Sequence, residues 1–145
     1  MVVLFVNPYK DLYIQFLEKN DIRYNVSEMD DNTVFVYFAG DYKEVIQVMI
    51  SFGGEGENKR HITAYCFDVA TATTDSYLNC LIACNQCNNE YIQIKFFLAD
   101  DNCVTAIVDA ELRPETCASD CDDLAQLLVV AVDKAYPEFV KAGCS

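Results

Sequence analysis

Apolar residues recur at helical spacing near the start of the chain, between two short polar stretches. Asn7-Pro8 precedes this segment and Asn20-Asp21 ends it. An Asn side chain can accept a hydrogen bond from a free helix amide, and proline suits the first helical position because its missing N–H has no partner there. The pattern therefore predicts a first helix with an apolar face made of Leu12, Tyr13, Phe16 and Leu17.

Five runs rich in β-branched and aromatic residues predict five strands. Three of them follow the first helix, at residues 33–39, 44–52 and 61–70. The other two flank a polar turn, at residues 91–99 and 103–112. Strands joined by short connections pair antiparallel, so the first three predict a meander and the last two predict a hairpin.

Two further helices complete the predicted elements. Residues 73–75 offer caps for a helix that runs through about Asn88. The last helix is predicted to start at Ser119, because Ser119 and Asp122 have the spacing of a capping box with Asp in the place of Glu. Pro137 lies inside the apolar pattern of this helix and predicts a kink.

The predicted order is helix, three strands, helix, two strands, helix. Strands that neighbour each other in the sequence give no reason for a parallel sheet, which requires strands and helices to alternate. We therefore predict one α+β domain over residues 1–145. Its three helices are expected to cover one face of a five-stranded antiparallel sheet.

Composition narrows the classes of partner. The chain carries 10 Lys and Arg against 23 Asp and Glu, a formal net charge of −13. Such a surface repels phosphate backbones and anionic lipid, so we expect no nucleic-acid partner and no membrane partner. The longest wholly apolar runs, 2–6 and 127–132, are far shorter than the roughly 20 residues of a membrane span. We expect a cytoplasmic protein.

Three of the eight cysteines lie in the second predicted helix, at Cys80, Cys84 and Cys87. This spacing is the one with which radical S-adenosylmethionine enzymes hold an iron–sulfur cluster, from an open loop. Cysteines at positions i, i+4 and i+7 of a helix share one face, where free cysteine packs as a small apolar side chain. Core packing is therefore the favoured interpretation, and a metal-binding or redox protein is the alternative.

Other chemistry has little support in the sequence. His61 is the only histidine, and no known nucleophile or zinc motif accompanies it. The glycine-rich stretch 53–59 contains Glu55 and Glu57, which would repel a phosphate, so it is expected to be a hairpin loop. We predict no catalytic residues and no cofactor.

The second predicted helix has more apolar circumference than one sheet face requires. On a helical wheel, one arc consists of Leu78, Leu81, Ile82 and Asn85, and Tyr77 joins the three cysteines in an adjoining arc. Together the arcs span about 220°, whereas a stripe of about 100° covers one face. Either a neighbouring helix covers the remainder, or a partner does. The candidate partner-binding residues are Tyr77, Leu78, Leu81 and Ile82.

Several stretches of the sequence, together with the element order, resemble the bacterial YbjN family. They are Asn7-Pro8-Tyr9, the strand at 33–39, the stretch 85–88, and Asp133-Lys134-Ala135-Tyr136-Pro137. The resemblance covers nearly the whole chain. It implies a fold similar to the small dimeric chaperones of type III secretion and a role in sensory transduction. It implies no active-site residues, and the three cysteines of the second helix are not part of it.

The residues and the resemblance lead to one expectation about function. We expect a non-enzymatic protein-binding domain with a chaperone-like or regulatory role. A homodimer is the expected assembly, because a two-fold interface uses the same apolar patch twice. Another protein could also bind this patch.

Overall fold

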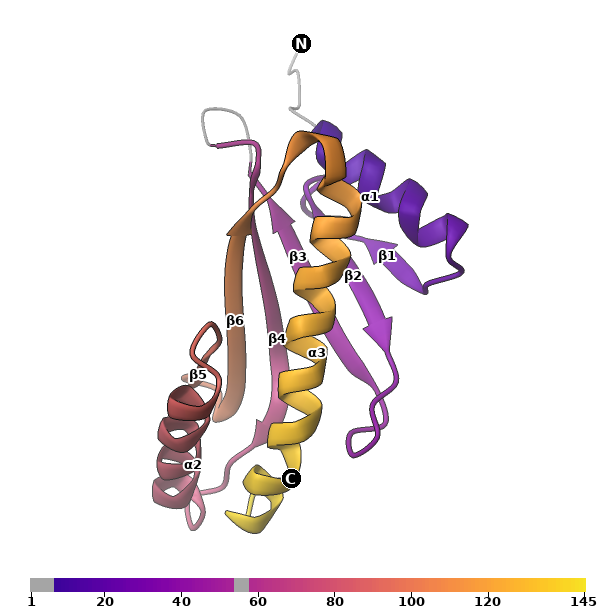
Figure 1. Cartoon of the computed structure of the whole chain (residues 1–145). Coiled ribbons are helices and arrows are strands. Elements are labelled where there is room, and N and C mark those ends of the chain that lie inside the picture. The colour runs from indigo at the N-terminus through magenta and orange to yellow at the C-terminus, as the bar shows by residue number, and fades with distance from the viewer. Residues whose placement is uncertain (1–6, 54–57) are drawn as a thin grey trace.

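The computed structural model describes residues 7–53 and 58–145, and this part of the chain forms three α-helices and a six-stranded sheet (Figure 1). The helices are α1 (Pro8–Lys19), α2 (Tyr77–Glu90) and α3 (Cys117–Lys141). The strands are β1 (Tyr24–Val26), β2 (Thr33–Phe38), β3 (Ile46–Phe52), β4 (His61–Thr71), β5 (Lys95–Leu98) and β6 (Cys103–Glu111). The predicted α+β class with an antiparallel sheet is confirmed. The apolar run 2–6 and the centre of the glycine-rich loop, 54–57, lie outside the described residues.

The strands lie in the order β1-β2-β3-β4-β6-β5, and all neighbours pair antiparallel. The predicted meander, β2 to β4, and the predicted hairpin, β5 with β6, are both present. The hairpin joins the sheet through β6, which pairs with β4. As a result, β5 forms one edge of the sheet and β1 forms the other.

The prediction of five strands was wrong, because β1 precedes the meander and changes the element order. This strand has three residues and pairs only with β2, from Tyr24 opposite Val36 to Val26 opposite Val34. Neither Asn25 nor Val26 is buried. A segment this short has no period of its own that a sequence pattern could reveal.

The helix layer predicted on one face of the sheet consists of α1 and α3, whereas α2 lies at the β5 edge. The helix α3 packs across β3, β4 and β6, with α1 on one side of it and α2 on the other, beside β5 (Figure 1). The side chains between these layers are fully buried and include Val36, Val48, Ile50, Ala64 and Ala106. None of the described helices has the length and apolar character needed to cross a bilayer.

The start of α3 differs from the predicted capping box. The helix begins at Cys117, two residues early, and the Ser119 hydroxyl donates to the Thr116 carbonyl instead of capping. The carboxylate that forms hydrogen bonds at the start of this helix is that of Asp120, which accepts from the Arg113 backbone N–H and guanidinium. These bonds lower the pKa of Asp120 to about 2. A partner outside the helix therefore fixes its start, which a local motif cannot indicate.

Asn7 caps α1 as predicted and also ties the helix to the sheet. Its Oδ1 accepts from the Tyr9 amide at 2.9 Å. Its own backbone N–H donates to Asn32 Oδ1 at 2.7 Å, and its Nδ2 donates to the Gly53 carbonyl at 2.8 Å. Asn7 is fully buried, so these bonds satisfy polar groups that water cannot reach. Through its backbone and its side chain, Asn7 thus joins α1 to the start of β2 and the end of β3.

Asp133 of α3 holds the loop between β2 and β3. Its carboxylate accepts from the backbone N–H groups of Asp41, Tyr42 and Lys43 at 2.9–3.0 Å. A Cβ atom at Gly40 would lie 2.3 Å from Asp133 Oδ1, so the close approach of loop and carboxylate requires glycine. Burial alone would raise the pKa of Asp133, but the three donors together hold it below its usual value.

We predict that Asp133→Asn lowers the free energy of unfolding at pH 7 by about 1–3 kcal/mol. The Asn side chain has no negative charge and only one accepting oxygen, so it cannot replace both carboxylate oxygens as acceptors of the three bonds. The folded-state pKa is lowered, so the contribution of the carboxylate is complete above the unfolded-state pKa of about 3.9 and is lost as the pH falls below it. Urea unfolding at pH 7 and pH 3.5 should show the difference shrinking in acid. Asp123→Asn, at an exposed position of the same helix, is the control. Equal stability of Asp133→Asn and wild type at pH 7 would contradict this role.

Candidate functional site

The helix α2 presents its cysteines to the core and is fastened to the edge of the sheet. Cys80, Cys84 and Cys87 are each at most 4% exposed. At the C-terminal end, Asn88 Oδ1 accepts from the Phe96 amide at 2.6 Å, and Asn88 Nδ2 donates to the Phe96 carbonyl at 3.0 Å. The Asn88 side chain thereby occupies both outward backbone groups of the middle of β5. The position of α2 is fixed by packing and by these two hydrogen bonds, which we call the Asn88–Phe96 bond pair.

The exposed part of α2 carries the four candidate partner-binding residues, which we call the α2 surface. Tyr77, Leu78, Leu81 and Ile82 are between 40% and 68% exposed. Neither α1 nor α3 covers these four side chains. The apolar excess predicted from the helical wheel therefore faces solvent in the single chain.

The α2 surface is also free of charge. The 14 residues from Ser76 to Asn89 contain no Asp, Glu, Lys or Arg, which is the longest such stretch in the sequence. Asn85 and Asn89 continue the same side of the helix and are exposed. In a chain with a net charge of −13, this stretch is a place where another surface can approach without meeting a like charge.

The cysteines of α2 have properties opposite to those of a reactive site. Burial raises the pKa of Cys84 and of Cys87 to about 11. Burial, and then the hydrogen bond with Cys144, also raises the pKa of Cys80. Reactive cysteines need a lowered pKa, because the thiolate is the nucleophile. Among residues 7–53 and 58–145, no group of three or more His, Cys, Asp and Glu side chains has the arrangement to hold a metal ion.

His61 lies at the exposed start of β4, as predicted. Its Nε2 is 3.5 Å from Asp109 Oδ2, and both side chains are largely exposed. An exposed imidazole beside an exposed carboxylate is a surface contact of small energetic value. His61 is therefore not assigned to a site.

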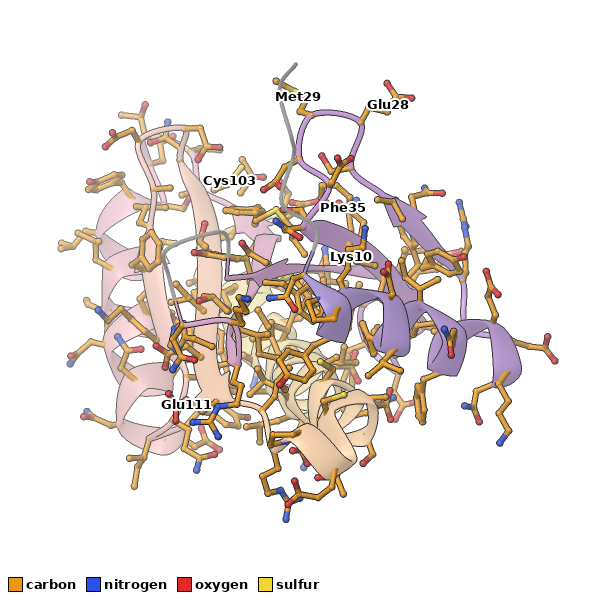
Figure 2. The ribbon with its side chains drawn as sticks, turned by 90° about the horizontal axis from the view of Figure 1, so that it is seen from above. Lys10, Glu28, Met29, Phe35, Cys103 and Glu111 are labelled. Atoms are coloured by element: carbon orange, nitrogen blue, oxygen red, sulfur yellow. The ribbon has the colours of Figure 1, made fainter. Side chains whose placement is uncertain are left out.

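The sequence analysis missed a second apolar surface, on the sheet face that the helices leave bare. We call it the open sheet face, and its residues are Phe35, Tyr37, Met49, Tyr65, Phe67 and Ile107. All six are partly or largely exposed. Figure 2 shows Phe35 on the side of the sheet that points away from α3. The signal was present in β2, where 34–38 is apolar or aromatic at every position, a pattern typical of a strand covered on both faces.

These observations define a small α+β domain with two apolar surfaces and no assigned catalytic group. No family model matches the sequence, and no curated protein matches it. Among solved structures, the chain is similar to the crystal structure of YbjN, "a putative transcription regulator from E. coli". The two chains are 11% identical, the alignment covers 97% of this chain and 96% of that one, and the TM-score is 0.63. The comparison shows a YbjN-like fold.

We predict that Cys103 reacts with a thiol reagent at pH 8 at least about tenfold faster than any other cysteine. It is the one partly exposed cysteine of the eight, all of which lie in the described residues, and the other seven are buried. Burial removes access and raises the pKa of Cys84 and Cys87. Mass spectrometry of labelled peptides gives the rate for each residue. Labelling of Cys84 or Cys87 as fast as Cys103 would instead favour the redox alternative.

Proposed function

We propose that the chain is a non-enzymatic protein-binding domain, chaperone-like or regulatory, that forms a homodimer through the α2 surface. The observation that carries the proposal is the exposure of Tyr77, Leu78, Leu81 and Ile82 on a helix that is otherwise well anchored. Apolar patches of this kind on a small domain mark interaction sites. A binding role also agrees with the description of the YbjN structure as a regulator and with the dimeric chaperones that the sequence resemblance implies.

A second copy of the chain fits the α2 surface because the surface has no charge. Two chains with a net charge of −13 each repel one another, and the repulsion is least where both contribute uncharged residues. A two-fold axis through α2 would place the same four side chains against each other. Burial of apolar area at about 25 cal/mol per Å² then supplies the attraction.

The Asn88–Phe96 bond pair supports the same proposal. If α2 moved relative to the rest of the domain, binding would have to order the helix, and the free energy that this costs would lower the affinity. Both amide groups of Asn88 bond to the β5 backbone, and the cysteine side of α2 is buried. The α2 surface is therefore held in one orientation before any partner arrives.

We predict that Leu81→Glu raises the dissociation constant of the dimer at least about tenfold, because it places a charge in the middle of the apolar contact. The matched control is Leu12→Glu on α1, since Leu12 is 44% exposed and Leu81 is 40% exposed. Both variants add the same charge to the same kind of residue. Sedimentation equilibrium should show the loss of the dimer for Leu81→Glu alone.

Salt provides an independent measurement on the wild-type protein. Added NaCl screens the repulsion between the two acidic chains, so we expect the dimer to tighten between 50 and 500 mM. An interface held by ion pairs would loosen over the same range. A wild-type protein that sediments as a monomer at every salt concentration would refute the proposed assembly.

A further inference from the structure

The open sheet face is continuous across the whole sheet. One row of residues in register crosses all six strands: Asn25, Phe35, Met49, Tyr65, Ile107 and Lys95. The four central members of this row are apolar or aromatic. The polar members stand only at the two edge strands. The row is thus an apolar band with polar ends, and no described helix lies over it.

The open sheet face carries aromatic residues at positions where a water-facing sheet normally carries polar ones. In an antiparallel sheet with one solvated face, polar residues normally alternate with buried ones. Here Tyr65 and Phe67 follow each other on the same side of β4, with ring centroids 5.2 Å apart and planes 8° from parallel. Phe67 is 50% exposed. Large apolar patches of this kind are typical of binding surfaces.

The charges beside the open sheet face exclude one class of ligand. Aromatic sheet faces can bind single-stranded nucleic acid by base stacking, but only together with a cationic groove for the phosphates. On this sheet Asp109 and Glu111 continue the side of β6 on which Ile107 lies. The cations Lys95 and Arg23 lie at the two opposite edges, Arg23 with its guanidinium 4.7 Å from the centre of the Tyr37 ring, and so form no groove. These carboxylates would meet a phosphate backbone with like charge.

The backbone of the sheet decides which kind of protein segment fits. The face offers only side chains, because the strands use their N–H and C=O groups in the ladders. An extended segment on the face would leave its own backbone groups without partners, whereas a helix satisfies them internally. Pairing at an edge is restricted as well. Asn88 occupies both outward groups of Phe96 on β5, and β1 has three residues.

We propose that the open sheet face binds an amphipathic helix of a partner protein whose polar flanks are cationic. Leucine-like residues of the helix would cover Phe35, Met49 and Tyr65, and lysine or arginine at its flanks would meet the acidic side chains beside the face. A second copy of the chain would bring its own acidic side chains to the same place. The proposal goes beyond the dimer at α2 and does not depend on it.

A synthetic helix of about 18 residues, with leucine on one face and lysine on the other, is the probe. Such a helix is about 27 Å long, close to the roughly 24 Å between the outer strands of a six-stranded sheet. Titration calorimetry at 50 mM NaCl is expected to show one probe bound per chain. The dissociation constant should rise at least about tenfold at 500 mM NaCl, because salt screens the charge pairs.

Two variants that add the same charge at different places locate the binding site. Phe67→Glu on the open sheet face is expected to weaken binding of the leucine–lysine probe at least about tenfold. Leu81→Glu on the α2 surface adds an equal charge and is expected to leave the affinity within about twofold. Equal effects of the two variants would overturn the proposal, and so would equal binding of a scrambled peptide of the same composition.

A second pair of variants tests the charge without disturbing the aromatic residues. Asp109→Asn with Glu111→Gln should weaken probe binding about threefold and reduce its salt dependence, because charge–charge attraction is lost. Asp11→Asn with Asp123→Asn removes the same charge from exposed positions on α1 and α3 and should have less effect. Equal effects of the two pairs would show attraction to net charge only and would overturn the proposed site.

The same variants separate this proposal from the proposed dimer. If Phe67→Glu, and not Leu81→Glu, lowers the mass in sedimentation, the open sheet face is an interface between copies of this chain, and the partner-helix proposal is overturned. If Leu81→Glu leaves the mass unchanged but Phe67→Glu abolishes probe binding, the dimer proposal fails and the open sheet face stands.

Discussion

The pleat of the six-stranded sheet sends alternate side chains to opposite faces, and the helices of the described chain cover only one of those faces. On the covered face, Val36, Val48 and Ile50 are fully buried beneath the helix layer. On the other face, the same strands carry Phe35, Met49 and Tyr65 into partial exposure. Because both sets alternate along the same strands, the apolar character of the bare face is not a by-product of core formation. It is a property that the fold does not need for its own core.

Charge distinguishes the two apolar surfaces of the molecule. The α2 surface lies within the longest uncharged stretch of the sequence, whereas the open sheet face has Asp109 and Glu111 beside Ile107 on β6. A surface without charge tolerates a copy of itself, and a surface beside carboxylates favours a cationic partner. We therefore expect salt to strengthen the proposed dimer and to weaken the proposed binding of a cationic helix. In these two proposals, the distribution of the net charge of −13 over the surface determines which kind of partner each surface favours.

Local patterns in the sequence predicted the elements whose causes are local. Asn7-Pro8 marked the start of α1, because capping and the proline position depend on neighbouring residues only. The apolar excess of α2 was also predictable, since it follows from the helical period. The start of α3 was not predictable, because Arg113, which lies outside the helix, donates hydrogen bonds to Asp120 in its first turn. The strand β1 was missed because its three residues gain their structure from pairing with β2.

The open sheet face could be predicted from the sequence only in part. The run of apolar residues in β2 indicates two covered faces, but no pattern says whether the second cover comes from the same chain. That question is settled by where the helices pack, and α3 lies across one side of the sheet. For the candidate site, the identity of Leu78, Leu81 and Ile82 was readable from a wheel, whereas their exposure required the placement of α3 and β5 against the other side of α2.

The treatment of the sheet edges explains why both proposed contacts use side chains rather than strand pairing. An unpaired edge is a template for the addition of another strand, and proteins limit it by short strands or by covering groups. Asn88 supplies β5 with a donor and an acceptor from a single side chain, in place of the two that a further strand would offer at Phe96. At the other edge, β1 is too short to guide an extended partner. Both proposed associations therefore use the faces of the molecule, where apolar contact would supply attraction and the surrounding charge would select the partner.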